Sequence, residues 1–159
     1  MRFESLNSIN KMVTDTLLRN QTLCKLLFYT DGAPEEHPDL DDPSALLYTC
    51  LFPSPHIPDS EASPGVYLSF HFDDFGLSAE NTGRREGTLR FNLMTHDTLW
   101  RLDAPDQWRP YSILYELDET LQRQRMAGVR TLKFVKGEFL GVCSHYAGYQ
   151  VVYRMTAAN

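Results

Sequence analysis

The sequence has little positive charge, and this shortage limits what the chain can bind. Lysine and arginine together number 15 against 21 aspartates and glutamates, which gives a formal net charge of −6 over 159 residues. Proteins that clamp DNA or RNA regardless of sequence depend on neutralising phosphates with basic side chains. The composition therefore argues against such clamping by the chain as a whole, while an acidic wall that repels DNA and lets it slide is compatible with it.

Cysteine is also scarce, with Cys24, Cys50 and Cys143 as the three examples. An odd number without paired spacing favours reduced thiols in a cytosolic setting over a disulfide framework. No apolar run follows Arg2 and Glu4, so we expect no signal peptide, and no stretch has the length of a membrane span. A chain of 159 residues that is 42% hydrophobic can bury a core of its own, and we expect a single domain, 1–159.

The motifs that usually mark a reaction centre are missing as well. The sequence contains no Gly-x-Gly-x-x-Gly, phosphate loop, Gly-x-Ser-x-Gly elbow or Cys-x-x-Cys. We therefore expect no enzyme activity, no catalytic residue, no cofactor and no metal. For Cys143-Ser144-His145 we favour a core thiol beside a surface histidine, because sequence neighbours rarely form a nucleophile–base pair.

One group of residues supports an alternative to a protein without enzyme activity. His71 and His96 can face each other across a hairpin with Asp73 nearby, which is the basis for a small metal-dependent enzyme. The simpler interpretation, which we favour, is polar positions on the solvated face of a sheet. Asp73 and Asp74 can share a cation only if a bulge turns them to one side, because strand neighbours point to opposite faces.

The strongest pattern in the sequence lies in residues 65–100. Apolar residues alternate with polar ones over 66–73 and again over 89–96, which predicts two long strands with one apolar face. The apolar set comprises Val66, Leu68, Phe70, Phe72, Leu89, Phe91 and Leu93. The linker 76–87 has three glycines and several charges and predicts an exposed, mobile hairpin tip.

Helical spacing predicts helices over 5–18, over 21–29 with Asn20 as cap, and from Pro110 to a stop at Gly128. The last of these has an apolar stripe suited to cover the apolar face of the hairpin. Two late strands are expected over 131–139 and 149–155. This order of elements predicts an α+β fold, with a mostly antiparallel sheet and helices packed on one face.

Residues 30–64 differ from the rest because they hold seven of the nine prolines and many acidic residues. We expect an extended arm between the N-terminal helices, 1–29, and an α+β core, 65–159, with one helical turn over 43–48 capped by Asp42. The arm also carries the apolar residues Leu46, Leu47, Leu51 and Phe52. Either these pack on the body or they meet another subunit. A further alternative is an adaptor that binds partners through the arm, 31–64.

Four other residues are candidates for an interface. Arg84 and Arg85 form a basic spot at the hairpin tip, where they can touch an acidic patch of a partner. Trp100 and Trp108 lie near Tyr111 and Tyr115 around the start of the main helix, where large aromatic side chains serve as core or interface anchors.

Several segments together resemble a known family. A strand reading Thr-Leu-Arg-Phe-Asn-Leu-Met-Thr-His (88–96), then Arg-Pro-Tyr and a helix with Glu-Leu-Asp-Glu-Thr-Leu (116–121), then two late strands, resembles the tail-completion and tail-terminator proteins of tailed bacteriophages. The block Leu-Leu-Phe-Tyr-Thr-Asp (26–31) with the acidic arm looks like small neck proteins involved in head–tail joining. The arm is longer than in compact members of the family.

This resemblance implies a structural virion protein of the neck or tail. The expected assembly is a six-fold homo-oligomeric ring that caps the tail tube, joins it to the connector and contacts other neck and tail-tube proteins. DNA would pass through its channel without specific binding, and no membrane would be involved. The ring would be built in the cytoplasm of the host bacterium and reside in the virion.

Overall fold

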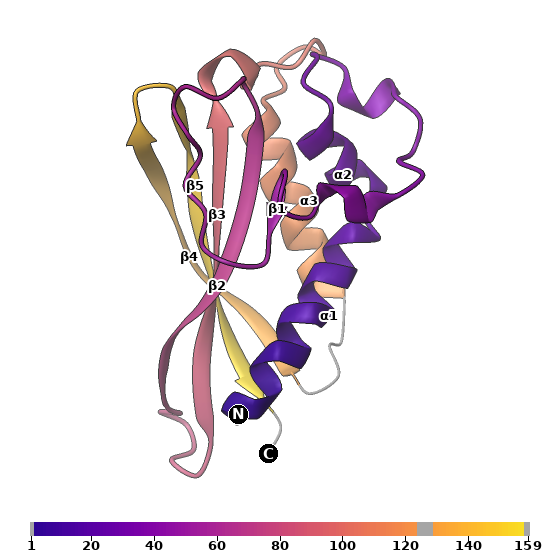
Figure 1. Ribbon diagram of the computed structural model, residues 1–159. Helices are drawn as coiled ribbons and strands as arrows, with labels where there is room; N and C mark the ends of the chain where they lie inside the picture. Colours follow the sequence, from indigo (N-terminus) through magenta and orange to yellow (C-terminus); the bar gives the residue numbers. More distant parts are fainter. Residues whose placement is uncertain (1, 124–128, 158–159) are drawn as a thin grey trace.

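The computed structural model describes residues 2–123 and 129–157 and arranges them in two layers, a sheet and a set of helices (Figure 1). The longer helices are α1 (Leu6–Leu18), α2 (Gln21–Phe28) and α3 (Arg109–Arg123), and the strands are β1 (Leu51–Phe52), β2 (Val66–Leu77), β3 (Arg85–His96), β4 (Val129–Cys143) and β5 (Tyr146–Ala157). Short 3-10 turns are η1 (Phe3–Ser5), η2 (Pro34–Glu36), η3 (Pro43–Leu46) and η4 (Asp97–Leu99). None of the described helices is long and apolar enough to cross a membrane.

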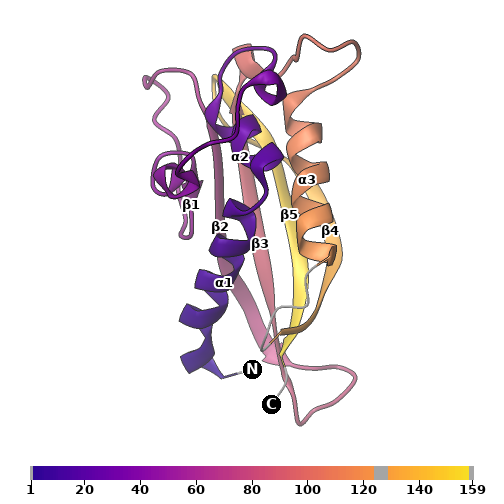
Figure 2. The same cartoon turned by 90° about the vertical axis from the view of Figure 1, so that its right-hand side faces the viewer.

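The five strands form one sheet in the order β1-β2-β3-β5-β4. The short strand β1 runs parallel to β2, and the other three pairings are antiparallel. Figure 2 shows the three helices on the same side of this sheet. The predicted α+β fold with a mostly antiparallel sheet and helices on one face is therefore confirmed.

The alternating pattern of the hairpin places its apolar residues against the helices. Phe70 pairs with Phe91 and Leu68 with Leu93 across β2 and β3, and all four side chains are fully buried. The helices contribute a buried stripe at helical spacing, which comprises Ile9, Val13 and Leu17 of α1 and Ile113, Leu117 and Leu121 of α3. Burial of these apolar surfaces supplies the main driving force for folding. The predicted role of α3 as cover for the sheet is confirmed, and α1 and α2 share it.

Asn20 connects α2 to α3 at the predicted cap. Its side-chain oxygen accepts a hydrogen bond from the backbone N–H of Leu23 at 3.0 Å. Its amide nitrogen donates to Glu116 at 2.9 Å and to Thr120 at 2.8 Å. One side chain therefore both caps α2 and holds it against α3.

We expect Asn20→Ala to lower the free energy of unfolding by roughly 2 kcal/mol, because it removes a cap and two cross-helix bonds. Urea titration followed by circular dichroism measures this loss. Asn20→Ser keeps a cap of similar strength and should lose only about half as much. Equal losses for the two variants would show that the cap contributes nothing.

A buried arginine that the sequence pattern did not single out joins four segments. Arg109, at the first position of α3, has no exposed surface. Its guanidinium donates to the backbone carbonyls of Leu26 at 2.9 Å, Tyr29 at 2.8 Å and Asp31, and its Nε donates to Leu99 at 2.9 Å. The carbonyls at the end of α2 carry its negative dipole, so a cation is well placed there.

The strands of the predicted hairpin and the two late strands extend farther than the sequence pattern indicated. The linker predicted over 76–87 is strand at both ends, since β2 runs to Leu77 and β3 begins at Arg85. The register shifts between Asp73 and Gly76, and this bulge lets pairing continue into the polar region. The late strands likewise cover 129–143 and 146–157. The predicted helix stop at Gly128 lies outside the described residues.

The proline-rich segment packs on the body and is not a free extension. Leu46 and Leu51 are fully buried, and the Asp42 side chain accepts from the Ser44 N–H at 3.1 Å, as predicted for the cap of this turn. Beyond β1 the chain crosses the sheet on the side away from the helices (Figure 1). There the His56 ring stacks on Phe52 with 3.6 Å between centroids. Of the two alternatives for the apolar residues of the arm, the structure supports packing on the body.

Candidate assembly surface

The outermost strand β4 leaves one margin of the sheet open. It pairs with β5 on its inner side, and no other described strand pairs with its outer side. Every residue from Lys133 to Phe139 is exposed. An edge strand of this length presents unpaired N–H and C=O groups that can add a strand from another chain.

An apolar groove lies beside this margin, between α3 and the strands β4 and β5. Its cavity volume is about 550 Å³. The aromatic side chains that line it are Tyr115, Phe134, Tyr149 and Tyr153. Phe134 is 54% exposed and Tyr115 is 62% exposed. Gly137 keeps the groove open, since a Cβ there would lie 3.3 Å from Val151.

The floor of the groove is fixed by hydrogen bonds. The Tyr153 hydroxyl donates to Asp118 at 2.7 Å, and burial together with this carboxylate raises the pKa of Tyr153. The Tyr149 hydroxyl donates to the Tyr111 hydroxyl at 3.3 Å, and this bond raises the pKa of Tyr149. Phe139, which is 66% exposed, stands edge-on to Tyr149 with 6.0 Å between centroids. The groove is thus a rigid aromatic surface that remains open to solvent.

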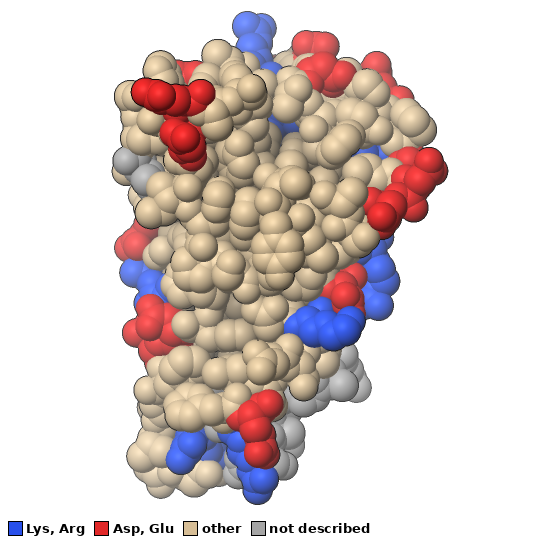
Figure 3. Space-filling model, viewed as in Figure 1, with Lys and Arg blue, Asp and Glu red and all other residues tan. Residues whose placement is uncertain are grey.

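The opposite margin of the sheet is open as well. β1 covers β2 only at Leu68 and Ser69, and no other described strand pairs with the outer side of β2 from Phe70 to Leu77. The face seen in Figure 3 has its charged side chains gathered toward its margins, so its middle is largely uncharged. The sheet therefore offers two different open edges on opposite sides of the molecule.

The interface candidates from the sequence fall into two groups. Leu46, Leu51 and Phe52 are buried and Leu47 packs against the core, so their side chains face the body of the protein. The other four reach the surface to differing degrees: Arg84, Arg85, Trp100 and Trp108. Arg85 lies over the Phe3 ring at 5.9 Å, while Trp100 donates to the Thr95 carbonyl at 3.2 Å. Of the two tryptophans, Trp108 is the more exposed, with 43% of its surface open to solvent.

The proposed grouping of His71, His96 and Asp73 is wrong. His71 lies opposite Arg90, six residues along β3 from His96, which is a separation of about 20 Å at the rise of an extended strand. Asp73 and Asp74 do converge at the bulge, but the cation between them is Arg90, whose Nε lies 3.0 Å from Asp73. The guanidinium thus occupies the place that a metal would take.

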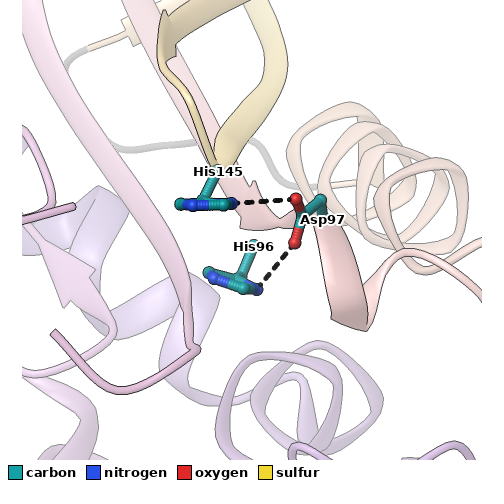
Figure 4. A group of neighbouring side chains, drawn as sticks. All are labelled: His96, Asp97 and His145. Carbon is teal, nitrogen blue, oxygen red and sulfur yellow. Dashed lines mark hydrogen bonds and ion pairs between the residues drawn. The ribbon is translucent and has the colours of Figure 1, made fainter. Parts of the chain in front are cut away.

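His96 belongs to another cluster, which the sequence pattern did not reveal. It lies beside Asp97 and beside His145 in the turn between β4 and β5 (Figure 4). The Asp97 carboxylate is 3.1 Å from the Nδ1 atom of each histidine. The hydrogen bond from His145 holds the pKa of Asp97 below its usual value, and the charges of both histidines act in the same direction. The predicted surface position of His145 is confirmed, since its side chain is 54% exposed, whereas Cys143 is only partly buried and is not the core thiol that we expected.

Comparison with known proteins gives one result that bears on function. The family model described as YomW matches residues 20–155, which include α2, α3 and nearly all of the sheet. No curated protein matches the chain. The name YomW is that of a phage-like gene product of Bacillus, so the match indicates a phage-associated protein.

Proposed function

Because this chain belongs to the YomW family and is thereby phage-associated, we propose that it is a structural protein of the virion that assembles through the open edges of its sheet. The proposed assembly is a ring of identical subunits, with β4 of one copy beside the free part of β2 in the next. The observation that carries this proposal is the pair of unlike open edges on opposite margins of one sheet.

Two unlike edges favour a head-to-tail contact. A contact between different surfaces of identical subunits repeats from copy to copy and closes into a ring when the rotation permits. Pairing between β4 and β2 would satisfy backbone groups that otherwise face water. It would also extend one sheet around the whole assembly.

The aromatic groove supplies a second support for this contact. Phe134 and Phe139 project from the open strand, and Tyr115 lies across the groove from Phe134. Tyrosine and phenylalanine are enriched in the cores of protein interfaces, where they bury much area at low entropic cost. Lys133 and Lys136 on the same strand discourage unspecific pairing, as charges on natural edge strands do.

The proposed role of the ring within the virion follows from the resemblance to tail-completion and tail-terminator proteins. In this proposal the ring is six-fold, caps the tail tube and meets the connector, and the chain performs no reaction. The net charge of −6 suits a channel wall that repels DNA and lets it pass. Assembly would take place in the host bacterial cytoplasm before the ring joins the virion.

We expect Phe139→Lys to prevent self-association while leaving the fold intact, because it places a charge in the centre of the proposed contact. Sedimentation velocity over a concentration series compares the variant with the unmodified chain. Ile57→Lys is the matched control, since Ile57 is 73% exposed and lies on the crossing segment, beside Asn92 and Leu140 on the face of the sheet opposite the aromatic groove. The control should associate as the unmodified chain does.

Two results would contradict the proposal. One is a strictly monomeric unmodified chain at its highest soluble concentration. The other is association that survives Phe139→Lys but is lost in Ile57→Lys, which would place the contact on the crossing segment.

A further inference from the structure

We propose that His96, Asp97 and His145 form a binding site for a divalent transition metal, with Zn²⁺ as the best match. The three side chains come from two places in the sequence that the fold joins, the end of β3 with η4 and the turn between β4 and β5 (Figure 4). One ligand atom from each lies within 4.8 Å of the others. The site is separate from the proposed assembly surface.

The backbone holds these side chains together independently of any ion. The N–H of Asp97 donates to the carbonyl of His145 at 2.9 Å, which attaches the turn to the start of η4. The Tyr146 ring meets the His96 ring edge-on, with 5.1 Å between centroids, and restricts its orientation. The two imidazole rings are nearly parallel, at 19° and 5.6 Å. A site arranged in advance costs little ordering when a ligand binds.

The geometry suits a small ion at the position that the ligand atoms surround. Each Nδ1 atom is 3.1 Å from an oxygen of the Asp97 carboxylate. Ligand atoms at tetrahedral angles around zinc are roughly 3.4 Å apart, given Zn–N lengths of 2.0–2.1 Å. Small rotations of the exposed Asp97 and His145 side chains therefore suffice to place three ligands around one ion.

The donor set selects the class of metal. Two imidazoles and one carboxylate suit Zn²⁺ and its transition-metal neighbours, whereas Mg²⁺ and Ca²⁺ prefer oxygen ligands. His96 is 9% exposed, while the Asp97 and His145 side chains are more than half exposed. The open side gives an entry path and leaves a fourth position for water. An ion would replace two contacts of His96 Nδ1, with the Thr98 hydroxyl at 2.8 Å and with the backbone N–H of Thr98 at 3.3 Å.

The experiment is calorimetric titration of the full chain, without an affinity tag, with ZnCl₂ and separately with MgCl₂. We expect one Zn²⁺ per chain, no Mg²⁺ binding, and a rise in Tm with Zn²⁺, because an ion that binds only the folded state stabilises it. His145→Ala should weaken Zn²⁺ binding at least about tenfold, since removing a ligand costs no less than removing an outer-shell partner. His37→Ala, which removes a histidine from the separate Asp31–His37 pair, should bind as the unmodified chain does.

Absence of Zn²⁺ binding by the unmodified chain would overturn the proposal. So would a His145→Ala chain that is folded and binds Zn²⁺ as tightly as the unmodified chain. Asp97→Asn provides an independent check, because it removes the charged ligand from the exposed side and should also weaken binding.

Discussion

Replacing Arg109 with methionine is expected to lower the free energy of unfolding by at least about 4 kcal/mol, which is at the extreme of single substitutions. The change removes a buried charge that donates to four backbone carbonyls and leaves those acceptors without their donors. Each hydrogen bond from a charged group contributes roughly 1.5–3 kcal/mol, and orphaned buried groups add the cost of desolvation. Urea titration monitored by circular dichroism measures the loss.

Arg101→Met is the matched control, because Arg101 is exposed and lies in the loop that leads to α3. It should change stability by no more than about 0.5 kcal/mol. Arg109→Lys keeps the charge but has a single amine in place of a five-donor fork, so its loss should fall between the two. If Arg109→Met unfolds at the same urea concentration as the unmodified chain, the four bonds do not support the fold.

Gly148→Ala is expected to be the second most damaging change, with a loss of roughly 3 kcal/mol or more, at the upper end of overpacking effects. Gly148 lies in β5 opposite Met94 of β3 and Leu140 of β4. A Cβ atom at this position would lie 1.8 Å from the carbonyl oxygen of Leu93. The obstacle is backbone, so two strands of the sheet must separate to admit one methyl group.

Gly141→Ala tests whether the effect depends on position. Gly141 lies on the neighbouring strand, where a Cβ would meet only the Phe139 ring at 3.5 Å, an ordinary contact. This control should be neutral within about 0.5 kcal/mol. Thermal melts of both variants make the comparison, and equal melting temperatures would contradict the predicted clash.

The sequence was sufficient wherever a local pattern decides the structure. The alternation around Phe70 and Phe91 identified two strands and their buried face, because a period of two assigns each side chain to one side of a sheet. Asn20 and Asp42 were identifiable as caps, since a cap acts on a backbone group two or three residues away. The α+β class followed from the order of these elements.

The features that the sequence did not show depend on contacts between distant segments. His145 meets His96 and Asp97 only because β5 pairs with β3 along its whole length. Arg109 reads as an ordinary residue before Pro110, and nothing nearby in the sequence reveals the carbonyls that it binds about eighty residues away. The strand ends were underestimated because a bulge lets pairing continue through residues of low strand propensity.

The strand order β1-β2-β3-β5-β4 determines when the sheet can form during synthesis of the chain. Of the five strands, β5 comes last in the sequence but lies between β3 and β4 in the sheet. An inner strand of the sheet is therefore synthesised after all the others. Until Tyr146–Ala157 has left the exit tunnel, β3 has no neighbour on one side and β4 has nothing to join. A nascent polypeptide of this kind completes its tertiary structure only after translation has passed this strand, and a premature stop codon before it would yield no usable fragment.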